Sequence, residues 1–215
     1  MDSAFENMDR MYRHQRYFYD VTRRYYLLGR DQLIARFPDD KEFSVLEAGC
    51  GTGRNLALVA EKYPLAELYG LDASQEMLDS AQQKFSKKSL QDRINTKLAL
   101  ADEFAFDTTF GLKYPFDIIY FSFSISMIPP WKASVDNALR NLKPGGILYF
   151  VDFYDQRDLP KPISRGLKWW LRQFHVVYPR ELIPYLETLE NEGLGVLAFE
   201  SLFRSYSFIA RFEKS

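Results

Sequence analysis

The sequence predicts an α/β fold, a three-layer α-β-α sandwich built on a mostly parallel sheet. Short apolar segments alternate with longer amphipathic segments along residues 43–153, as strands joined by crossover helices do. The segment 116–121 is almost entirely apolar, which is typical of a parallel strand buried on both faces. Near the end of the chain, apolar residues 195–200 and 205–212 are joined by a short connection that suits an antiparallel pair. We therefore expect a mixed sheet whose last strand is reversed.

The first five strands are expected where an apolar run ends in acidic or turn-forming residues. These runs lie at 43–46, 65–71, 94–100, 116–121 and 147–153. The residues Lys143–Gly146 are expected to form the turn that leads into the last of them, because proline and glycine interrupt regular structure. The carboxyl ends of these strands are where ligands bind in open α/β sheets.

The expected helices are placed by their start and stop signals. A helix over 54–62 follows a glycine-rich loop and stops before Pro64, and the next begins after Ser74, a residue suited to the N-cap. Pro129–Pro130 is expected to open a helix that runs to Leu142, because proline suits the first helical turn. Residues 1–37 carry apolar side chains at helical spacing, so two helices broken near Leu28–Gly29 are expected before the sheet.

Length and composition indicate one domain and exclude several kinds of protein. With 215 residues, 47% of them hydrophobic, the chain suits a single domain over 1–215. Its expected parts are an N-terminal helical lid (1–37), a core (43–153), a helical segment (158–192) and a C-terminal hairpin (194–213). A net charge of −1 predicts no general attraction to nucleic acid, and the single cysteine, Cys50, excludes a disulfide framework or a cysteine-based metal site. No signal region or spanning apolar run is evident, so a cytoplasmic location is expected.

A glycine loop at residues 47–53 carries the strongest functional signal in the sequence. A carboxylate precedes three alternating glycines, a helix follows, and a second carboxylate, Asp72, stands about 20 residues further on. Backbone N–H groups at such a helix start are free to meet a ligand. The alternative is a tight strand-to-helix turn. The surrounding pattern favours a nucleoside site, in which Asp72 accepts hydrogen bonds from the ribose hydroxyls.

The spacing of the glycines decides between the classes of nucleotide ligand. Dinucleotide enzymes need a third glycine in G-x-G-x-x-G, and Arg54 or Leu56 stands in that place here. No phosphate-binding P-loop motif is present. Two other segments reach the same edge of the sheet. The turn 101–103 could flank an adenine or be an ordinary polar turn, and Met77 could contact an adenine face or pack in the core.

At this point the sequence resembles the class I S-adenosylmethionine-dependent methyltransferases. The resemblance rests on Glu47–Gly53, on Leu71–Asp72 and on Leu142–Gly146, in the expected order. It implies a seven-stranded sheet with a reversed final hairpin, and S-adenosylmethionine as the cofactor without a metal. The implied cofactor-binding residues are Glu47, Gly49, Cys50, Gly51, Gly53, Asn55, Asp72, Ala73, Met77, Ala101, Asp102, Glu103 and Phe121.

A narrower resemblance lies at the two ends of the chain. Met8–Arg13, Tyr19–Asp31 and Phe174–Arg180 are similar to segments of the bacterial betaine-lipid N-methyltransferases. The resemblance implies methylation of the amine of a diacylglycerol-homoserine lipid to give the trimethylhomoserine lipid. A quinone or other small-molecule C- or O-methyltransferase is the alternative within enzymes. A non-catalytic module that binds S-adenosylmethionine is the alternative of another class.

Aromatic side chains near the N-terminus are candidates for the acceptor site, because both cofactor and product are cationic and aromatic faces attract cations. For each of these tyrosines the alternative is ordinary helix packing. The candidate catalytic residues are Tyr19, Tyr26 and His175. The candidate substrate-binding residues are Tyr12, Tyr25, Arg30, Ser122, Ser126 and Met127, and Arg30 is suited to a carboxylate.

A basic segment, residues 161–180, interleaves Trp169–Trp170 with lysine and arginine and contains no acidic residue. Indole rings and cations suit the surface of an anionic membrane, so peripheral contact with the inner face of the membrane is one interpretation. The other is a helix that packs its tryptophans on the sheet. The expected partners are thus a lipid or small-molecule amine and this membrane surface, without nucleic acid.

Overall fold

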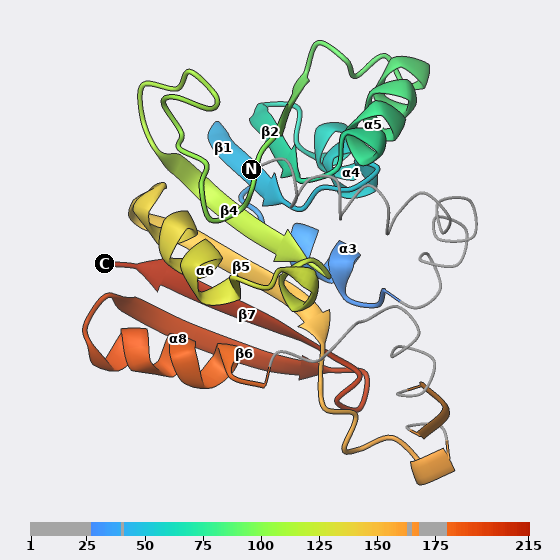
Figure 1. Cartoon of the computed structure of the whole chain (residues 1–215), viewed down its shortest axis with the longest axis vertical. Helices are drawn as coiled ribbons and strands as arrows, with labels where there is room; N and C mark the ends of the chain where they lie inside the picture. The colour runs from blue at the N-terminus through green and yellow to red at the C-terminus, as the bar shows by residue number, and fades with distance from the viewer. Residues whose placement is uncertain (1–26, 40, 163–164, 168–179) are drawn as a thin grey trace.

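The computed structural model describes residues 27–39, 41–162, 165–167 and 180–215 (Figure 1). Seven strands form one sheet in the order β3-β2-β1-β4-β5-β7-β6. The strands are β1 (Phe43–Ala48), β2 (Ala66–Asp72), β3 (Ile94–Leu98), β4 (Phe116–Ser122), β5 (Leu142–Phe153), β6 (Gly195–Leu202) and β7 (Ser207–Lys214). The expected seven-stranded mixed sheet is confirmed.

The direction of the strands follows the sequence pattern. The first five strands pair in parallel, whereas β7 pairs antiparallel with both β5 and β6. The short connection between β6 and β7 permits only a hairpin, so the last strand of the chain inserts reversed beside β5. The order changes direction between β1 and β4, which places the switch point of the sheet at the carboxyl ends of these two strands.

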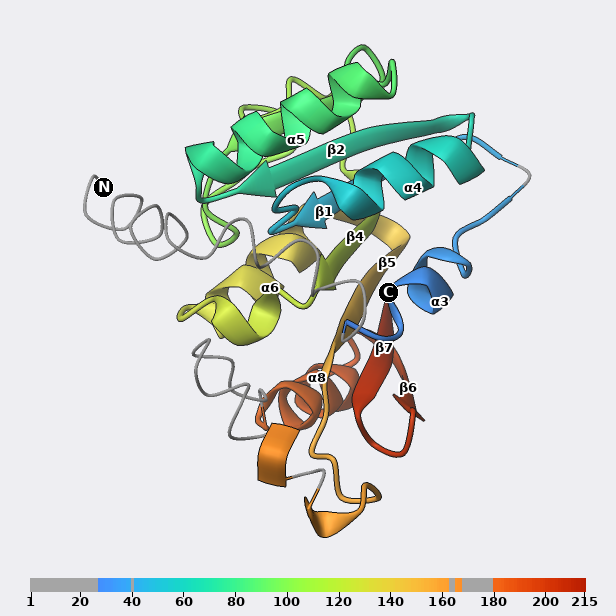
Figure 2. The same cartoon turned by 90° about the vertical axis from the view of Figure 1, so that its right-hand side faces the viewer.

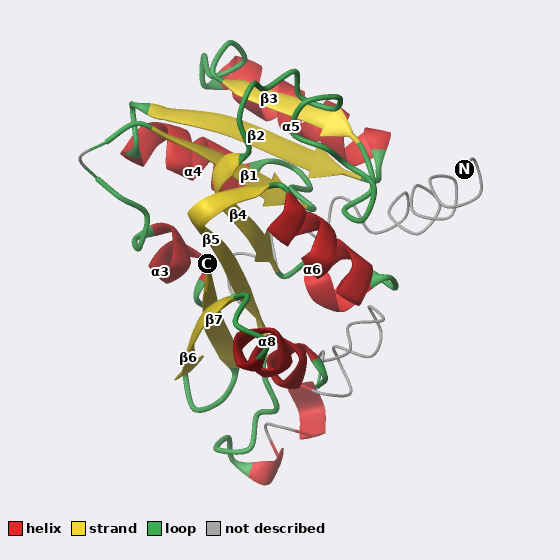
Figure 3. Ribbon diagram, turned by 90° about the vertical axis from the view of Figure 1, so that its left-hand side faces the viewer, coloured by secondary structure: helices red, strands yellow, loops and turns green. Residues whose placement is uncertain are grey.

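Helices cover both faces of the sheet and complete the three layers (Figures 2 and 3). The helices are α3 (Arg30–Ile34), α4 (Arg54–Lys62), α5 (Gln75–Lys87), the 3₁₀ turn η1 (Ile125–Met127), α6 (Trp131–Arg140) and α8 (Leu182–Asn191). One hydrophobic cluster joins α3, α4 and α5 to the sheet, and a second joins α6 and α8 to the opposite face. Every third or fourth residue of each long helix is apolar, so each buries one stripe against the sheet.

Local start signals are confirmed at two helices. The Ser74 hydroxyl accepts a hydrogen bond from the backbone N–H of Met77 at 3.4 Å, and α5 begins at Gln75, directly after Ser74. Gly53 has a left-handed backbone, φ 70°, and α4 begins immediately after it. The proline pair is followed by α6, which begins at Trp131 and ends at Arg140 rather than at Leu142.

The expected turn at Lys143–Gly146 is instead part of β5, where it forms an irregularity in the strand. Phe116 pairs with Leu142 and Ile118 with Ile147, so β5 uses more residues than β4 over the same length. Gly145 supplies the left-handed backbone of this excursion, with φ 73°. The backbone hydrogen bonds on both sides continue, so the strand bulges without ending.

Candidate active site

The main cavity opens at the carboxyl ends of the strands and has a volume of about 1020 Å³. It lies where the strand order reverses, between the ends of β1, β2 and β4 and the helices α3 to α5. Ligand pockets of proteins commonly measure ~300–1,000 Å³, so this cavity has room for a nucleoside cofactor and part of an acceptor. The glycine loop forms one wall and the segment after β4 forms another.

The glycine loop is shaped by backbone contacts that tolerate no side chain. Gly49 and Cys50 both donate their N–H to the Leu71 carbonyl, at 2.8 and 2.9 Å, so the loop folds back onto the end of β2. Gly49 has φ 79°, and a Cβ added there would lie 2.6 Å from the Ser124 Cβ. Glycine is therefore required both by the backbone and by the contact with the segment after β4. The loop and that segment form adjoining walls because of this close approach.

Asp72 joins the loop to the end of β2. Its two carboxylate oxygens accept the backbone N–H groups of Gly51, at 2.8 Å, and of Ser74, at 3.0 Å. Each oxygen of an ionised carboxylate has a further lone pair, so the side chain can still accept hydroxyl groups of a ligand. Only 8% of Asp72 is exposed, and it lines the cavity. The residue is thus both a structural support of the loop and a potential ribose acceptor.

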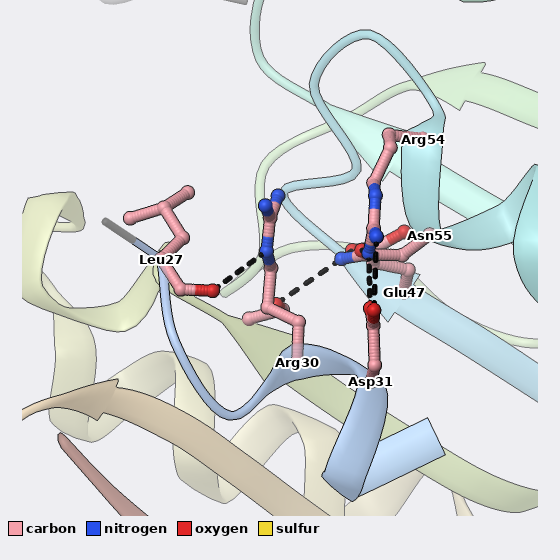
Figure 4. A network of polar contacts seen from close by, with 7 residues as sticks. Leu27, Arg30, Asp31, Glu47, Arg54 and Asn55 are labelled. Carbon is pink, nitrogen blue, oxygen red and sulfur yellow. Dashed lines mark hydrogen bonds and ion pairs between the residues drawn. The ribbon is translucent and has the colours of Figure 1, made fainter. Parts of the chain in front are cut away.

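Glu47 lies at the end of β1 and is 1% exposed, although it lines the cavity. The amide Nδ2 of Asn55 donates to its Oε1 at 2.7 Å and to the Ser122 hydroxyl at 3.1 Å (Figure 4). Among the residues that the structure describes, Glu47 Oε2 and the Tyr120 hydroxyl are buried without a hydrogen bond of ordinary geometry. A buried carboxylate oxygen beside a cavity is suited to receive a cationic group of a ligand.

Burial raises the pKa of Glu47 from 4.5 to about 7. The Asn55 hydrogen bond, the nearby Tyr120 phenol and the Arg30 guanidinium each lower this pKa, and the Asp72 carboxylate raises it. The loss of hydration dominates because the side chain is almost fully enclosed. Glu47 is therefore partly protonated at neutral pH and can take up the ionised form when a positive charge enters the cavity.

Ten of the thirteen residues expected to bind the cofactor line the cavity. They are Glu47, Gly49, Cys50, Gly51, Asn55, Asp72, Ala73, Met77, Ala101 and Asp102. The other three lie elsewhere for identifiable reasons. Gly53 packs against α5, where an added Cβ would lie 2.3 Å from Phe85 Cζ. Phe121 is fully buried and stacks on Phe150 at 5.4 Å, and Glu103 is exposed outside the cavity.

Three of the residues expected to bind the acceptor, Arg30, Ser122 and Met127, line the cavity. Ser126 does not, because both its N–H and its hydroxyl bind Asp152, at 3.2 and 3.1 Å. The remaining candidates lie outside the described residues. They are Tyr12, Tyr19, Tyr25, Tyr26 and His175, together with Trp169–Trp170.

Several polar residues that the sequence motifs did not single out also lie in the cavity wall. Arg54 and Asp31 line it beside Arg30, and Lys84 lines it while donating to the Thr52 hydroxyl at 3.0 Å. The sequence pattern identifies Arg54 only as the residue that replaces the third glycine of the dinucleotide motif. Its role depends on the approach of α3 to α4, a tertiary contact that no local pattern shows.

Comparison with known proteins agrees with this geometry. Residues 46–148 match the family model described as a methyltransferase domain. This region resembles a methyltransferase domain. Over 116 residues, 54% of its length, the chain is 33% identical to a trans-aconitate 2-methyltransferase of Azoarcus sp. (strain BH72), and the match covers 41% of that protein. A demethylmenaquinone methyltransferase of Lactiplantibacillus plantarum is 32% identical over 138 residues, which cover 62% of this chain and 55% of that protein.

Solved structures extend the likeness of the methyltransferase domain to the whole fold. A putative S-adenosyl-L-methionine-dependent methyltransferase from Methanococcus maripaludis superposes with a TM-score of 0.63 at 17% identity, covering 98% of this chain and 92% of that chain. The plantazolicin methyltransferase in complex with SAH gives a TM-score of 0.66 at 15% identity, covering 91% and 88%. These structures share the fold of this chain. The chain spans less than half of the length of the trans-aconitate methyltransferase it matches.

The residues of this cavity fit S-adenosylmethionine, the cofactor of the methyltransferases that the chain resembles. A sulfonium cofactor needs a carboxylate for its ammonium group, an acceptor for its ribose hydroxyls and room for its adenine. The buried Glu47 oxygen, Asp72 and the apolar wall beside Met77 supply these features in one cavity. No group of three or more metal-ligating side chains that could hold a metal ion occurs among the residues described. Nor is any helix in the described part of the chain long and apolar enough to cross a membrane.

Proposed function

We propose that this chain transfers methyl groups from S-adenosylmethionine to the amine of a diacylglycerol-homoserine lipid. The observation that carries the transfer itself is the convergence of Glu47, the glycine loop and Asp72 on one cavity at the switch point. Glu47 would receive the cofactor's ammonium group, the loop would support its methionine part, and Asp72 would hold its ribose. The cofactor supplies an activated methyl group on a sulfonium.

The transfer requires little from the protein beyond positioning. Glu47 and Asp72 would hold the cofactor so that its methyl group is available for in-line displacement by the lone pair of the acceptor nitrogen. An ammonium acceptor must first lose its proton. Holding two reactants in line within a site shielded from water supplies much of the rate enhancement for such a displacement. The cavity can serve this purpose because its walls enclose more space than a nucleoside needs.

The choice of a lipid amine is supported by two features. The sequence similarity to betaine-lipid N-methyltransferases includes Tyr19–Asp31, whose last residues enter the described structure and line the cavity. Within that segment Arg30 lies in the cavity wall, where a guanidinium can bind the carboxylate of a homoserine head group. The acceptor would then be held by its carboxylate while its amine faces the cofactor.

A second candidate is a C- or O-methyltransferase of a small molecule. It is favoured by the relatives, which are named as trans-aconitate, demethylmenaquinone and other methyltransferases. Those proteins match 54% and 62% of this chain, and the family model covers residues 46–148, which include most of the residues expected to bind the cofactor. We therefore take the relatives to indicate the methyl donor more than the acceptor.

The deciding experiment is incubation of the protein with methyl-labelled S-adenosylmethionine and a total lipid extract. We expect label in a polar lipid that separates with trimethylhomoserine lipid, and no label when Asp72 is replaced by alanine. Label in a quinone or in a water-soluble acid would replace the lipid amine with the second candidate. Absence of any binding of the cofactor in calorimetric titration at millimolar concentration would overturn the proposed transfer altogether.

A further inference from the structure

An ion pair joins the start of α3 to the start of α4 at the edge of the cavity. Arg54 Nη1 and Nη2 donate to the two carboxylate oxygens of Asp31, at 2.5 and 3.2 Å. Figure 4 shows the Asp31 carboxylate directly facing the guanidinium. The Asp31 side chain is 66% exposed and the Arg54 side chain 38%. Ion pairs at such exposure contribute little to stability. We therefore consider how this ion pair orients the neighbouring side chains rather than how much it stabilises the fold.

Arg54 also fixes the orientation of the neighbouring amide. Its Nη1 donates to the Asn55 Oδ1 at 3.2 Å. An amide has one end that only accepts hydrogen bonds and one that only donates. With its oxygen engaged by the guanidinium, Asn55 must present its nitrogen to the Glu47 Oε1, at 2.7 Å. A half-turn of the amide would set oxygen against carboxylate and nitrogen against guanidinium, two repulsive contacts.

Charged groups on several elements face Glu47, and α3 acts on it in two ways. Arg30 of α3 favours the ionised carboxylate directly. Asp31 acts through Arg54 and Asn55. The other titratable neighbours are Tyr120 on β4, Asp72 on β2 and Cys50 in the loop. The helix itself is anchored, because its apolar residues 33 and 34 are each 1% exposed within the core.

We propose that Arg54, held by Asp31, is a positioning residue that orients the Asn55 amide toward Glu47, so that α3 controls binding of the cofactor through this relay. The proposal rests on the proposed function, because it takes Glu47 to be the group that receives the cofactor's positive charge. It gives α3 a role in binding the cofactor that the glycine loop alone does not explain.

The first test is the affinity for S-adenosylmethionine of the Arg54→Gln variant, measured by calorimetry. The cofactor carries a net positive charge, so removal of a nearby cation would strengthen binding if only Coulomb forces mattered. In Arg54→Gln the Asn55 amide loses its fixed orientation, so we expect the affinity for S-adenosylmethionine to fall, by about fivefold if the effect resembles that of an exposed charge pair. Binding as tight as that of the wild type, or tighter, overturns the proposal. Glu213→Gln is the matched control, because it breaks the half-buried Arg211–Glu213 pair (2.7 Å), whose residues do not line the cavity, and should leave affinity unchanged.

The second test needs no cofactor and therefore separates this proposal from the proposed function. The ionisation of Glu47 is followed by carboxyl ¹³C NMR in the ligand-free protein, with Glu47→Gln used to assign the signal. In Asp31→Asn the removal of a negative charge alone would lower the pKa of Glu47. Release of Arg54 and Asn55 raises it instead, because the hydrogen bond that favours the carboxylate is loosened. A pKa of Glu47 that falls or stays unchanged in Asp31→Asn overturns the relay, even if the cofactor does not bind.

Discussion

Binding of the cofactor should release protons from Glu47, and this linkage is open to direct measurement. In the ligand-free protein, burial raises the pKa of Glu47 from 4.5 to about 7, which corresponds to about 3–4 kcal/mol at ~1.4 kcal/mol per pH unit. A cationic ligand beside the carboxylate favours its ionised form. At pH 7 about half of the molecules must therefore lose a proton when the cofactor binds, and at pH 6 about nine in ten must do so.

The affinity for S-adenosylmethionine should consequently rise with pH from 6 to about 7.5 and then level off. The limiting slope below pH 7 is about tenfold per pH unit. Calorimetric titration in two buffers of different ionisation enthalpy gives the number of protons released directly. In Glu47→Gln the proton release should vanish and the affinity should stay at the weak, low-pH level throughout. A wild-type affinity that is constant from pH 6 to 8, or a proton release that persists in Glu47→Gln, would refute this account of Glu47.

Three further predictions concern the loop and the core. Asp72→Ala should weaken cofactor binding by ~10- to 100-fold in calorimetry, because hydrogen bonds to a charged group contribute about 1.5–3 kcal/mol and the loop loses its support; an effect below threefold would contradict the ribose role. Gly53→Ala should lower the free energy of unfolding by ~1–3 kcal/mol more than Gly145→Ala in urea titration. The two glycines have φ of 70° and 73°, but only at Gly53 would the Cβ meet Phe85, so equal losses would argue against the steric cause. Burial also raises the pKa of Asp152 to about 7. The folded chain thus holds protons on Asp152 and on Glu47 that the unfolded chain has lost. The free energy of unfolding should therefore fall between about pH 5 and 7, by at most ~1.4 kcal/mol per pH unit for each of the two groups, and level off above 8. The measurement is the midpoint of urea unfolding across this pH range. A midpoint that does not change with pH would contradict the raised pKa of Asp152.

The sequence predicts the sheet well because its signals are local and repeat along the chain. The helix after Ser74 and the apolar strand β4 each follow from a few neighbouring residues. The reversed hairpin follows from a connection too short for a crossover. The prediction of a turn at Lys143–Gly146 is wrong because proline and glycine indicate only a local change of backbone direction. They do not show whether the pairing resumes on either side.

In the candidate site, too, the residues that a local motif determines are predicted correctly, and those that depend on tertiary contacts are not. Residues that a motif places at the end of a strand, such as Glu47 and Asp72, reach the cavity, because the direction of the strand decides where they lie. Phe121 does not, because it stacks on Phe150 inside the core, and Ser126 of η1 does not, because it is hydrogen-bonded to Asp152. The ion pair of Arg54 with Asp31 joins residues 23 positions apart and depends on how α3 docks, so no spacing rule could reveal it.

The reversal of β7 determines where the end of this chain leaves the molecule. Because β7 runs opposite to β5, its last residues lie at the amino ends of the parallel strands, beside Leu142 and Leu194. Figure 1 shows this end on the side away from the arrowheads of β1, β4 and β5. A surface tether or a fluorescent protein joined after Ser215 would therefore face away from the cavity. Immobilised protein oriented in this way keeps its ligand entrance open, which makes surface-based measurement of the titrations above practicable.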